Sequence, residues 1–346
     1  MIRRKPQSRR PIEQPTAILH DSPAPKGFHD GVPFISDFND ISTSLADYMV
    51  NTPNYHVISV IGEQGVGKST LLSMLGGNKS LDMYREYIFR PVSREANELS
   101  KYQTMKLDLF ISAEKFILID CQPMNSVSLA EDFNRSSMLD ECGYTSEMMK
   151  MLSFLIHVSH TMLVCIDWFP SLSVVRSLVF AEKWRAHIDP YSFKMNLKRC
   201  VNIVLVHTKA RNSDFLPFTI RHRARLLRKM LENVKRFRLS PKDEELYFPI
   251  PELHLRKEMK VGNFTLPTPV IVKHHGGYIE EISEDFDVYI SKLRKSLFKL
   301  TKDDFTLDKV PIDQRKWLSL CHEVWNNDAL QLAAERYRQF LTVEKV

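Results

Sequence analysis

The chain has 346 residues, of which 43% are hydrophobic and 26% are charged, so it can bury a substantial core in one large domain or two smaller ones. Its formal net charge is +6, but residues 1–26 hold six basic and two acidic residues, a net +4, which leaves +2 for the remainder. The basic charge that would suggest a nucleic-acid partner therefore lies mostly in the N-terminal tail.

The five cysteines are far apart and form no C-x-x-C pair, which argues for reduced thiols in the cytosol or nucleus and against a zinc site. We expect neither a membrane span nor a secretion signal, because the sequence lacks both a long uninterrupted apolar stretch and an apolar region near its N-terminus. A cytoplasmic location is therefore predicted.

Residues 1–30 are predicted to be a disordered tail, because they combine this basic charge with five prolines and few large apolar residues. Such a tail can bind RNA, bind an acidic partner, or have no partner. After the tail, apolar residues at helical spacing predict a short leading helix within residues 34–50.

The stretch that follows is typical of a phosphate-binding loop. Residues 57–61 are an apolar run that predicts a buried strand, and it leads into G-x-x-x-x-G-K-S at residues 62–69 and then a helix. In such a loop, backbone N–H groups and a helix N-terminus face an anion, the lysine reaches the β- and γ-phosphates, and the serine holds Mg²⁺. The predicted phosphate-binding residues are Glu63, Gln64, Gly65, Val66, Gly67, Lys68, Ser69 and Thr70.

The polar segment 79–103 has no clean period and is either a mobile switch or a surface insertion. Residues 104–111 and 115–120 then predict an antiparallel hairpin, whose second strand ends on Asp120, as a Walker B strand ends on an acid. We expect Asp120 to bind Mg²⁺ through a water, together with Ser69.

Residues 124–145 are predicted to be irregular, and alternating helices and buried strands follow at 146–159, 161–168, 172–187 and 200–207. His157 and His160 are interpreted as ordinary helix-end histidines, because no acid or thiol accompanies them as a metal ligand would. The last of these strands closes on Thr208-Lys209-Ala210-Arg211.

Residues 215–239 predict one long amphipathic helix with Arg221, Arg225, Arg228, Lys229, Lys235 and Arg236 on its polar surfaces. These cations indicate either a solvated face or a site for an acidic or phosphate-bearing partner. Residues 240–269 are predicted to be an extended insertion, followed by a short strand at 270–272, a turn at 274–277 and a helix at 281–300. Two more helices are expected in the C-terminal part, with their junction at residues 326–328.

This order of elements predicts an α/β fold: a mainly parallel sheet with helices on both faces, one antiparallel edge hairpin and C-terminal helices. We expect residues 31–300 to form a nucleotide-binding domain with insertions near 79–103 and 240–269, and residues 301–346 to form a helical extension packed on it.

The order of elements resembles that of the small G-protein domain. Thr104 lies where the switch-I threonine stands in that family, and this implies a third Mg²⁺ ligand. Asp120 begins a D-x-x-G motif in which Pro123 replaces the glycine, and proline has no N–H to donate to a γ-phosphate. Met124 stands where many G proteins carry the glutamine that orients the attacking water, which a thioether cannot do.

The base-reading motif [NT]-K-x-D of that family is represented by Thr208, Lys209 and Arg211. Arginine replaces the aspartate that accepts two hydrogen bonds from guanine, so the preference for guanine should be weak and adenine nucleotides become plausible. Lys209 can still place its stem along the base.

With the basic Pro-rich tail and a Q-T-x-x-x-D-L run at 103–109, these motifs resemble the G-domain-like SMG subunit of nonsense-mediated mRNA decay, the ninth of that series. The resemblance covers roughly residues 34–300. It implies a non-catalytic subunit that binds GTP/GDP or ATP/ADP, with Mg²⁺, as a structural ligand. It also implies pairing with a sister G-like subunit (the eighth). The pair would regulate the phosphatidylinositol-3-kinase-related protein kinase that phosphorylates the decay helicase. We expect neither membrane binding nor direct RNA contact.

Two other functions stay open from the sequence. One is an active GTPase or ATPase in which Glu63 or an arginine from a partner chain supplies the missing catalytic group. The other is a nucleoside or nucleotide kinase, for which residues 211–238 would supply an arginine-rich lid.

Overall fold

The computed structural model describes residues 30–35, 40–81, 83, 86–137, 141–184, 199–251, 260–261, 264–265 and 286–344. The predicted tail, apart from Asp30, and the predicted strand 270–272 and turn 274–277 lie outside these residues.

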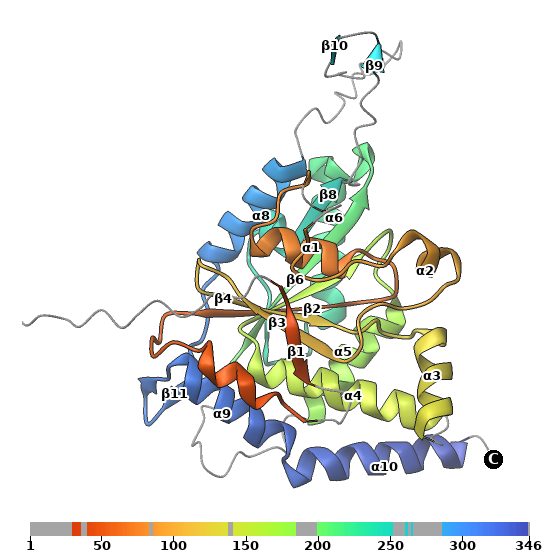
Figure 1. The fold of residues 1–346 in the computed structure, drawn as a ribbon, viewed down its shortest axis with the longest axis vertical. Coiled ribbons are helices and arrows are strands. Elements are labelled where there is room, and N and C mark those ends of the chain that lie inside the picture. Colours follow the sequence, from red (N-terminus) through yellow and green to blue (C-terminus); the bar gives the residue numbers. More distant parts are fainter. Residues whose placement is uncertain are drawn as a thin grey trace, which may run out of the picture.

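A mixed, mainly parallel sheet is the centre of the fold (Figure 1). Its strands are ordered β1-β3-β4-β2-β5-β6-β7, and β8 also pairs with β6. Only β1 with β3 and β3 with β4 pair antiparallel, and all the other pairs in this sheet are parallel. The strands are β1 (Val32–Ile35), β2 (His56–Gly62), β3 (Leu107–Ile111), β4 (Phe116–Cys121), β5 (Thr161–Ile166), β6 (Val201–Ala210), β7 (Phe237–Arg238) and β8 (Tyr247–Pro251).

Helices cover both faces of this sheet, which explains why its central strands are apolar on both sides. On β2, Ile58 and Val60 pack in the core beneath α1 (Lys68–Gly76) and α8 (Phe286–Lys299). The alternate residues Val57 and Ile61 pack in the core beneath the opposite layer, formed by α4 (Glu141–Val158), α5 (Leu172–Trp184) and α6 (Pro217–Leu231). Figure 1 shows α1 and α8 above the sheet and α4 below it.

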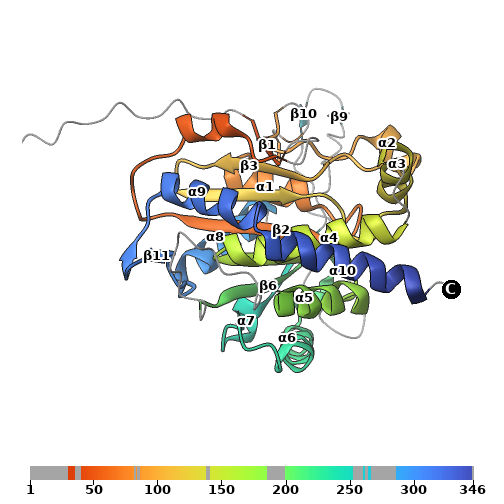
Figure 2. The same ribbon diagram turned by 90° about the horizontal axis from the view of Figure 1, so that it is seen from below.

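Two C-terminal helices, α9 (Gln314–Trp325) and α10 (Asp328–Glu344), form a further layer against α4, as Figure 2 shows from below. The indole nitrogen of Trp317 donates to the carbonyl oxygen of Val158 over 2.9 Å, and its ring stacks on Phe34 of the edge strand. The hydroxyl of Ser146 donates to the carbonyl oxygen of Ala334. Both helices and their junction at residues 326–328 occur where the sequence predicted them.

The short leading helix predicted within residues 34–50 is confirmed only in part, as a short 3₁₀ helix. Phe34 and Ile35 belong to β1, which extends the sheet beside β3, and only Thr43–Asp47 form a short 3₁₀ helix. The apolar residues at helical spacing, Ile41, Leu45 and Met49, are buried, but the residues before them pair with β3, so pairing across the sheet decides the structure of that part.

Residues 124–145 are also not irregular, because they contain α3 (Val127–Ser137) and the first turn of α4. Within residues 127–132 of α3 only Leu129 is buried, so the sequence carries too few apolar residues there to show the helical period.

Residues 240–269 are not purely an extended insertion, because α7 (Asp243–Leu246) and β8 lie within them. The strand was not predicted because Pro249 and Pro251 lie within it, and proline is rare inside strands. Among the described strands β8 pairs only with β6, and an edge strand tolerates proline because one side of it needs no ladder hydrogen bonds. The long helix predicted to reach residue 239 ends at Leu231, and Phe237–Arg238 form β7.

The remaining described elements are small. They are the helix α2 (Arg94–Glu98), a 3₁₀ helix at Asn212–Phe215, and two short hairpins, β9 (Lys260–Val261) with β10 (Phe264–Thr265) and β11 (Thr306–Leu307) with β12 (Val310–Pro311). No helix in the described ranges is both long enough and apolar enough to span a lipid bilayer.

Candidate nucleotide-binding site

The predicted phosphate loop connects the end of β2 to the start of α1. Gly65 and Gly67 have φ angles of 77° and 83°, in the left-handed region that favours glycine, and Gly67 is the N-cap of α1. The loop therefore leads directly into the helix N-terminus, whose first N–H groups have no partner within the helix and can bind an anion. Thr70 lies in the first turn of this helix.

Lys68 lies across this loop. Its Nζ donates to the carbonyl oxygen of Glu63 over 2.9 Å, and the side chain is almost fully buried. The ammonium group thus lies against the backbone of the loop, as is typical of a P-loop lysine.

The three residues predicted to hold Mg²⁺ come together at the start of α1. Ser69 Oγ donates to Asp120 Oδ2 over 2.7 Å, and Thr104 Oγ1 donates to the same oxygen over 3.0 Å. The two hydroxyl oxygens are 3.2 Å apart. Residues from three distant parts of the chain thus meet at one carboxylate.

Asp120 is a fully buried carboxyl with incomplete hydrogen bonding. Burial raises the pKa of this carboxyl, while the Lys68 ammonium and the hydroxyls of Ser69 and Thr104 oppose the rise. Its Oδ1 is buried and has no hydrogen-bond partner among the described residues.

This oxygen set fits Mg²⁺, a hard cation that prefers oxygen ligands and is usually held by one or two carboxylates together with phosphates. Among the described residues, no group of three or more His, Cys, Asp or Glu side chains is placed to hold a metal ion. His157 and His160 bond within the fold, to the carbonyl of Ser153 and the N–H of Val57, as expected for structural histidines.

The end of β6 joins the same loop from the other side. Thr208 Oγ1 donates to the carbonyl oxygens of Val66 and Ile166, over 2.6 and 3.1 Å, and Lys209 Nζ donates to the carbonyl oxygen of Gly65 over 2.9 Å. These bonds connect the predicted base-binding residues to the predicted phosphate-binding residues.

Arg211 is exposed beside these two residues, and the nearest acid along the chain does not replace the missing aspartate. Asp214 Oδ2 accepts from the backbone N–H of Arg211 over 2.8 Å, while Asp214 Oδ1 pairs with Arg223 over 2.8 Å. Arg223 also contacts His207 and the hydroxyl of Tyr247. Because Asp214 is committed to this buried network, its carboxylate is not available to guanine.

The segment after β4 is bound to the phosphate loop, which the sequence analysis missed. Met124 N donates to the carbonyl oxygen of Gly62 over 3.0 Å, so the chain continues beside β2 for one bridge beyond β4. The side chain of Met124 is 1% exposed and belongs to the core under α4. It therefore points away from the loop.

Gln64 also has a place that its loop position did not indicate. Its Nε2 donates to the carbonyl oxygen of Ser100 over 2.9 Å, and its Oε1 accepts from Ser126 Oγ over 2.6 Å. Ser100 and Ser126 are thus site residues that the sequence analysis did not find, and no motif in the sequence indicates them.

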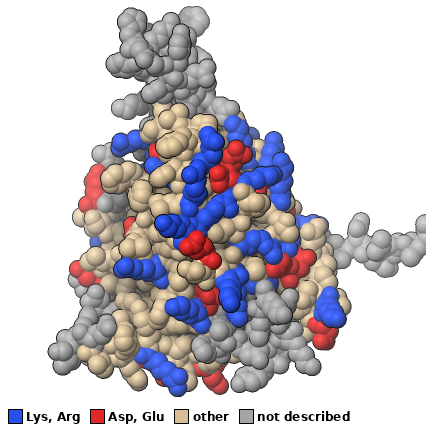
Figure 3. Space-filling model, turned by 180° about the vertical axis from the view of Figure 1, so that it is seen from behind, with Lys and Arg blue, Asp and Glu red and all other residues tan. Residues whose placement is uncertain are grey.

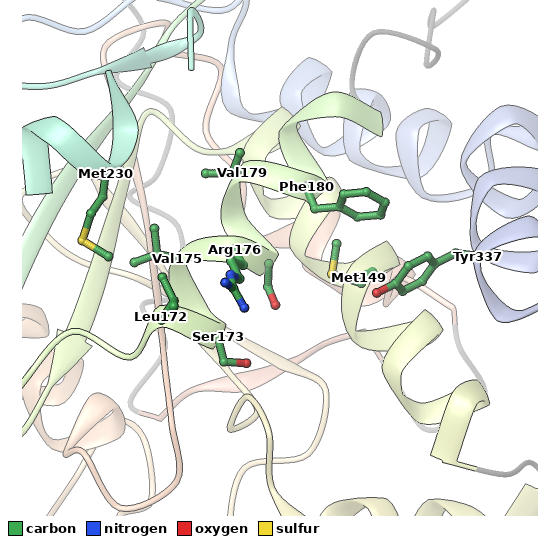
Figure 4. A pocket seen from close by; sticks show the side chains of 10 residues that line it. Met149, Leu172, Ser173, Val175, Arg176, Val179, Phe180, Met230 and Tyr337 are labelled. Atoms are coloured by element: carbon green, nitrogen blue, oxygen red, sulfur yellow. The ribbon is translucent and has the colours of Figure 1, made fainter. Parts of the chain in front are cut away.

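A hollow lies on the helical face of the molecule. It has a volume of about 680 Å³ and lies among α4, α5, α6 and α10 (Figure 4). Its lining is largely apolar, and Arg176 projects into it.

The basic face predicted for residues 215–239 is partly balanced by acids from other helices. Arg228 pairs with Asp243 and Arg236 with Glu182. Arg221, Arg225 and Lys229 are exposed and form no ion pair with a described residue. Figure 2 places α5, α6 and α7 on the side of the sheet opposite β1, and Figure 3 shows that face from behind, with many Lys and Arg side chains and scattered acids between them.

A glycine-rich loop between a central parallel strand and a helix, a buried aspartate beside the loop serine, and T-K at the end of a later strand together define a P-loop protein of the G-domain type. The antiparallel hairpin β3-β4 beside β2 agrees with this class. No protein-family model matches the chain.

Comparison with curated proteins identifies the family. The chain is 36% identical over 330 residues to the nonsense-mediated mRNA decay factor SMG9 of Caenorhabditis elegans, with 95% of this chain and 83% of that protein covered. It is 35% identical over 321 residues to SMG9 of Caenorhabditis briggsae, with coverages of 92% and 80%, and 22% identical over 352 residues to SMG9 of Xenopus tropicalis, with coverages of 92% and 68%. The chain belongs to the SMG9 family of nonsense-mediated mRNA decay factors.

Solved structures give weaker similarities. The translation elongation factor SelB from Methanococcus maripaludis, in complex with the GTP analogue GppNHp, matches with a TM-score of 0.29 and 11% identity, covering 57% of this chain and 30% of that one. A bacterial selenocysteine-specific elongation factor EF-Sec matches with a TM-score of 0.32 and 12% identity, covering 57% and 26%. Neither similarity is high enough to assign a function.

Proposed function

We propose that this SMG9-family chain binds a purine nucleotide with Mg²⁺ as a structural ligand and does not hydrolyse it. The proposal rests on the contrast between four residues that meet at the loop and one that does not face it. Lys68, Ser69, Thr104 and Asp120 stand at one loop, while Met124 is buried and tied to Gly62.

The phosphates would lie against residues 63–70, with Lys68 at the β- and γ-phosphates. Ser69, Thr104 and Asp120 would hold Mg²⁺, which when bound neutralises phosphate charge. A ligand that binds only the folded state stabilises it by about 2.7 kcal/mol at a hundredfold excess over its Kd, so the nucleotide can fix the loops around it.

The base would lie at Thr208, Lys209 and Arg211. Lys209 bridges to Gly65 and exposes its stem, whereas the cationic Arg211 offers only donors where guanine N1 and N2 need acceptors. ATP/ADP therefore fits this edge at least as well as GTP/GDP.

As a decay factor, the chain would act through binding partners in the cytoplasm. We propose that it heterodimerises with the sister G-like SMG subunit (the eighth) and that the pair regulates the phosphatidylinositol-3-kinase-related kinase that phosphorylates the decay helicase. The exposed cations on α6 and the apolar hollow along α5 are surfaces outside the nucleotide site on which protein partners can bind.

The proposal is tested by the nucleotide released on denaturing the purified chain, and by co-purification of the sister subunit. We expect about one nucleotide per chain in the wild type and almost none in Lys68→Ala, with weakened assembly in the variant. Thr301→Ala, outside the loop, is the control. If Lys68→Ala retains its nucleotide and assembles normally, the structural-ligand role is excluded.

A further inference from the structure

Gln64 joins the phosphate loop to two other segments at once. Through its amide nitrogen it holds the backbone at Ser100, just before Thr104, and through its amide oxygen it holds the hydroxyl of Ser126, just after Met124. A second hydroxyl, that of Ser128, lies 3.4 Å from the same oxygen. One side chain thus spans the three segments that surround the phosphate position.

Further bonds hold both segments in the same place. On one side, Thr104 bonds to Asp120, and the N–H of Lys106 donates to Gln122 Oε1 over 2.9 Å. On the other side, the N–H of Ser126 donates to the hydroxyl of Tyr144, and Ser126 Oγ accepts from the N–H of Leu129. All these bonds join protein to protein, so the arrangement needs no ligand to complete it.

In GTPases the corresponding loops are ordered by contacts with the γ-phosphate and its Mg²⁺ and are released on hydrolysis. A ligand can shift a conformational equilibrium only by its differential affinity for the two states. If the protein itself already holds both segments on the loop, a γ-phosphate has little left to order.

We propose that Gln64 is a positioning residue that replaces the γ-phosphate as the link between residues 98–106 and 123–130, so that both segments keep one arrangement in every nucleotide state. This inference rests on the proposed nucleotide binding for its ligand-dependent part only. A partner that contacts these segments would then meet the same surface whether a diphosphate or a triphosphate is bound.

The amide nitrogen and the amide oxygen of Gln64 bond to different segments, so the two contacts can be tested separately. Gln64→Glu keeps an oxygen that accepts from Ser126 but replaces the donor to Ser100 with a second acceptor, which repels the carbonyl. Gln64→Ala removes both hydrogen bonds. Gln331→Glu is the matched control, because Gln331 Nε2 also donates to a backbone carbonyl, that of Trp325, far from the loop.

Hydrogen exchange of the full chain is measured without nucleotide, with Mg²⁺ and a diphosphate, and with Mg²⁺ and a non-hydrolysable triphosphate, for both purine bases. In the wild type we expect the same protection of both segments with the diphosphate as with the triphosphate. In Gln64→Glu, exchange near Lys101 should rise about tenfold while that of Ser126 and Leu129 stays unchanged, since one hydrogen bond corresponds to about that factor.

In Gln64→Ala both segments should open without nucleotide and with the diphosphate, and the triphosphate should close them again. The proposal is overturned if the wild-type segments already differ between the two nucleotides, or if Gln64→Glu and Gln331→Glu give the same exchange. The exchange of the wild type and of the Gln64 variants can be compared without nucleotide. If the chain bound no nucleotide, the proposed function would be overturned, but this comparison would still test whether Gln64 holds the two segments.

Discussion

The backbone nitrogen of Met124 donates to the carbonyl oxygen of Gly62, and this bond turns the methionine side chain into the core. A glutamine at this position would therefore not reach a water beside a γ-phosphate. Restoring the residue that many G proteins carry here should not restore hydrolysis.

We predict that Met124→Gln gives no hydrolysis above the wild type and lowers the free energy of unfolding by about 1–3 kcal/mol, because it buries an amide without a partner. Phosphate release and urea unfolding measure the two effects. Met124→Leu, which keeps the apolar contacts, should cost less than Met124→Gln. A gain of turnover in Met124→Gln would show that the side chain does reach the site.

Asp120 gives a prediction that depends on pH. Because its pKa is raised in the folded state, the folded protein binds this proton more tightly than the unfolded chain, so stability is greatest below the ordinary pKa of the carboxyl and is lost as the pH rises from there through the raised pKa. Without Mg²⁺, Asp120→Asn should thus be more stable than the wild type at pH 8, and the difference should shrink as the pH falls.

Thermal unfolding with and without Mg²⁺ and nucleotide tests this prediction. The stabilisation that Mg²⁺ adds should grow with pH in the wild type and disappear in Asp120→Asn. An Mg²⁺ effect that survives in the variant would exclude Asp120 as a ligand.

Arg211 allows a test of base selectivity. Arg211→Asp supplies the two acceptor oxygens that guanine N1 and N2 require, so we predict that the preference for GDP over ADP rises at least about tenfold. Arg211→Ala removes the cation without supplying acceptors and should leave the preference nearly unchanged. Titration calorimetry with both nucleotides measures the ratio, and equal ratios in the two variants would place the base elsewhere.

Two buried histidines should make the stability of the fold sensitive to acid. Burial lowers the pKa of His56 to about 3, with help from the charge of Lys302, and lowers that of His160 well below its usual value. A lowered pKa means that the stability is fully present above about pH 6.5 and is lost as the pH falls below it, by about 1.4 kcal/mol per pH unit for each histidine.

We therefore expect the free energy of unfolding to fall steeply between pH 6.5 and 4. His160→Asn keeps an acceptor for the N–H of Val57 and should reduce this slope by about one proton. Urea titrations across this range test it, and an unchanged slope in the variant would assign the acid loss to other groups.

We propose that residues 301–346 belong to the same cooperative unit as the nucleotide-binding domain, because Trp317 joins α9 to the end of α4 and to β1. Trp317→Ala should lower the free energy of unfolding by about 3–5 kcal/mol and keep a single transition. Exposed Phe340→Ala should have little effect. Two separate transitions in the wild type would show that the extension folds independently.

Much of the fold was predictable because its central strands and helices carry strong periodic patterns. The loop at residues 62–69, the hairpin and the later strands all lie within a few residues of their predicted bounds. Several strands were not predicted, among them β1 and β8, which are strands because of their pairing partners: β1 pairs with β3, and the proline-containing β8 pairs with β6.

In the candidate site, too, some residues were predictable from the sequence and others were not. Lys68, Ser69 and Asp120 were predicted from motifs that adjoin periodic elements, and Thr104 from the resemblance to the small G-protein domain; the structure brings the four residues together. The roles of Gln64, Ser100 and Ser126 depend on where two irregular segments cross, and no periodicity encodes such a crossing.

The central claim is that this chain holds a nucleotide and does not hydrolyse it. The most direct measurement is single-turnover release of labelled phosphate from γ-labelled ATP and GTP, with the chain in excess, for the wild type and Lys68→Ala in parallel, with and without the sister subunit. We predict that the wild type retains the label as triphosphate and releases phosphate no faster than the variant. Release by the wild type at a rate that Lys68→Ala abolishes would contradict the claim.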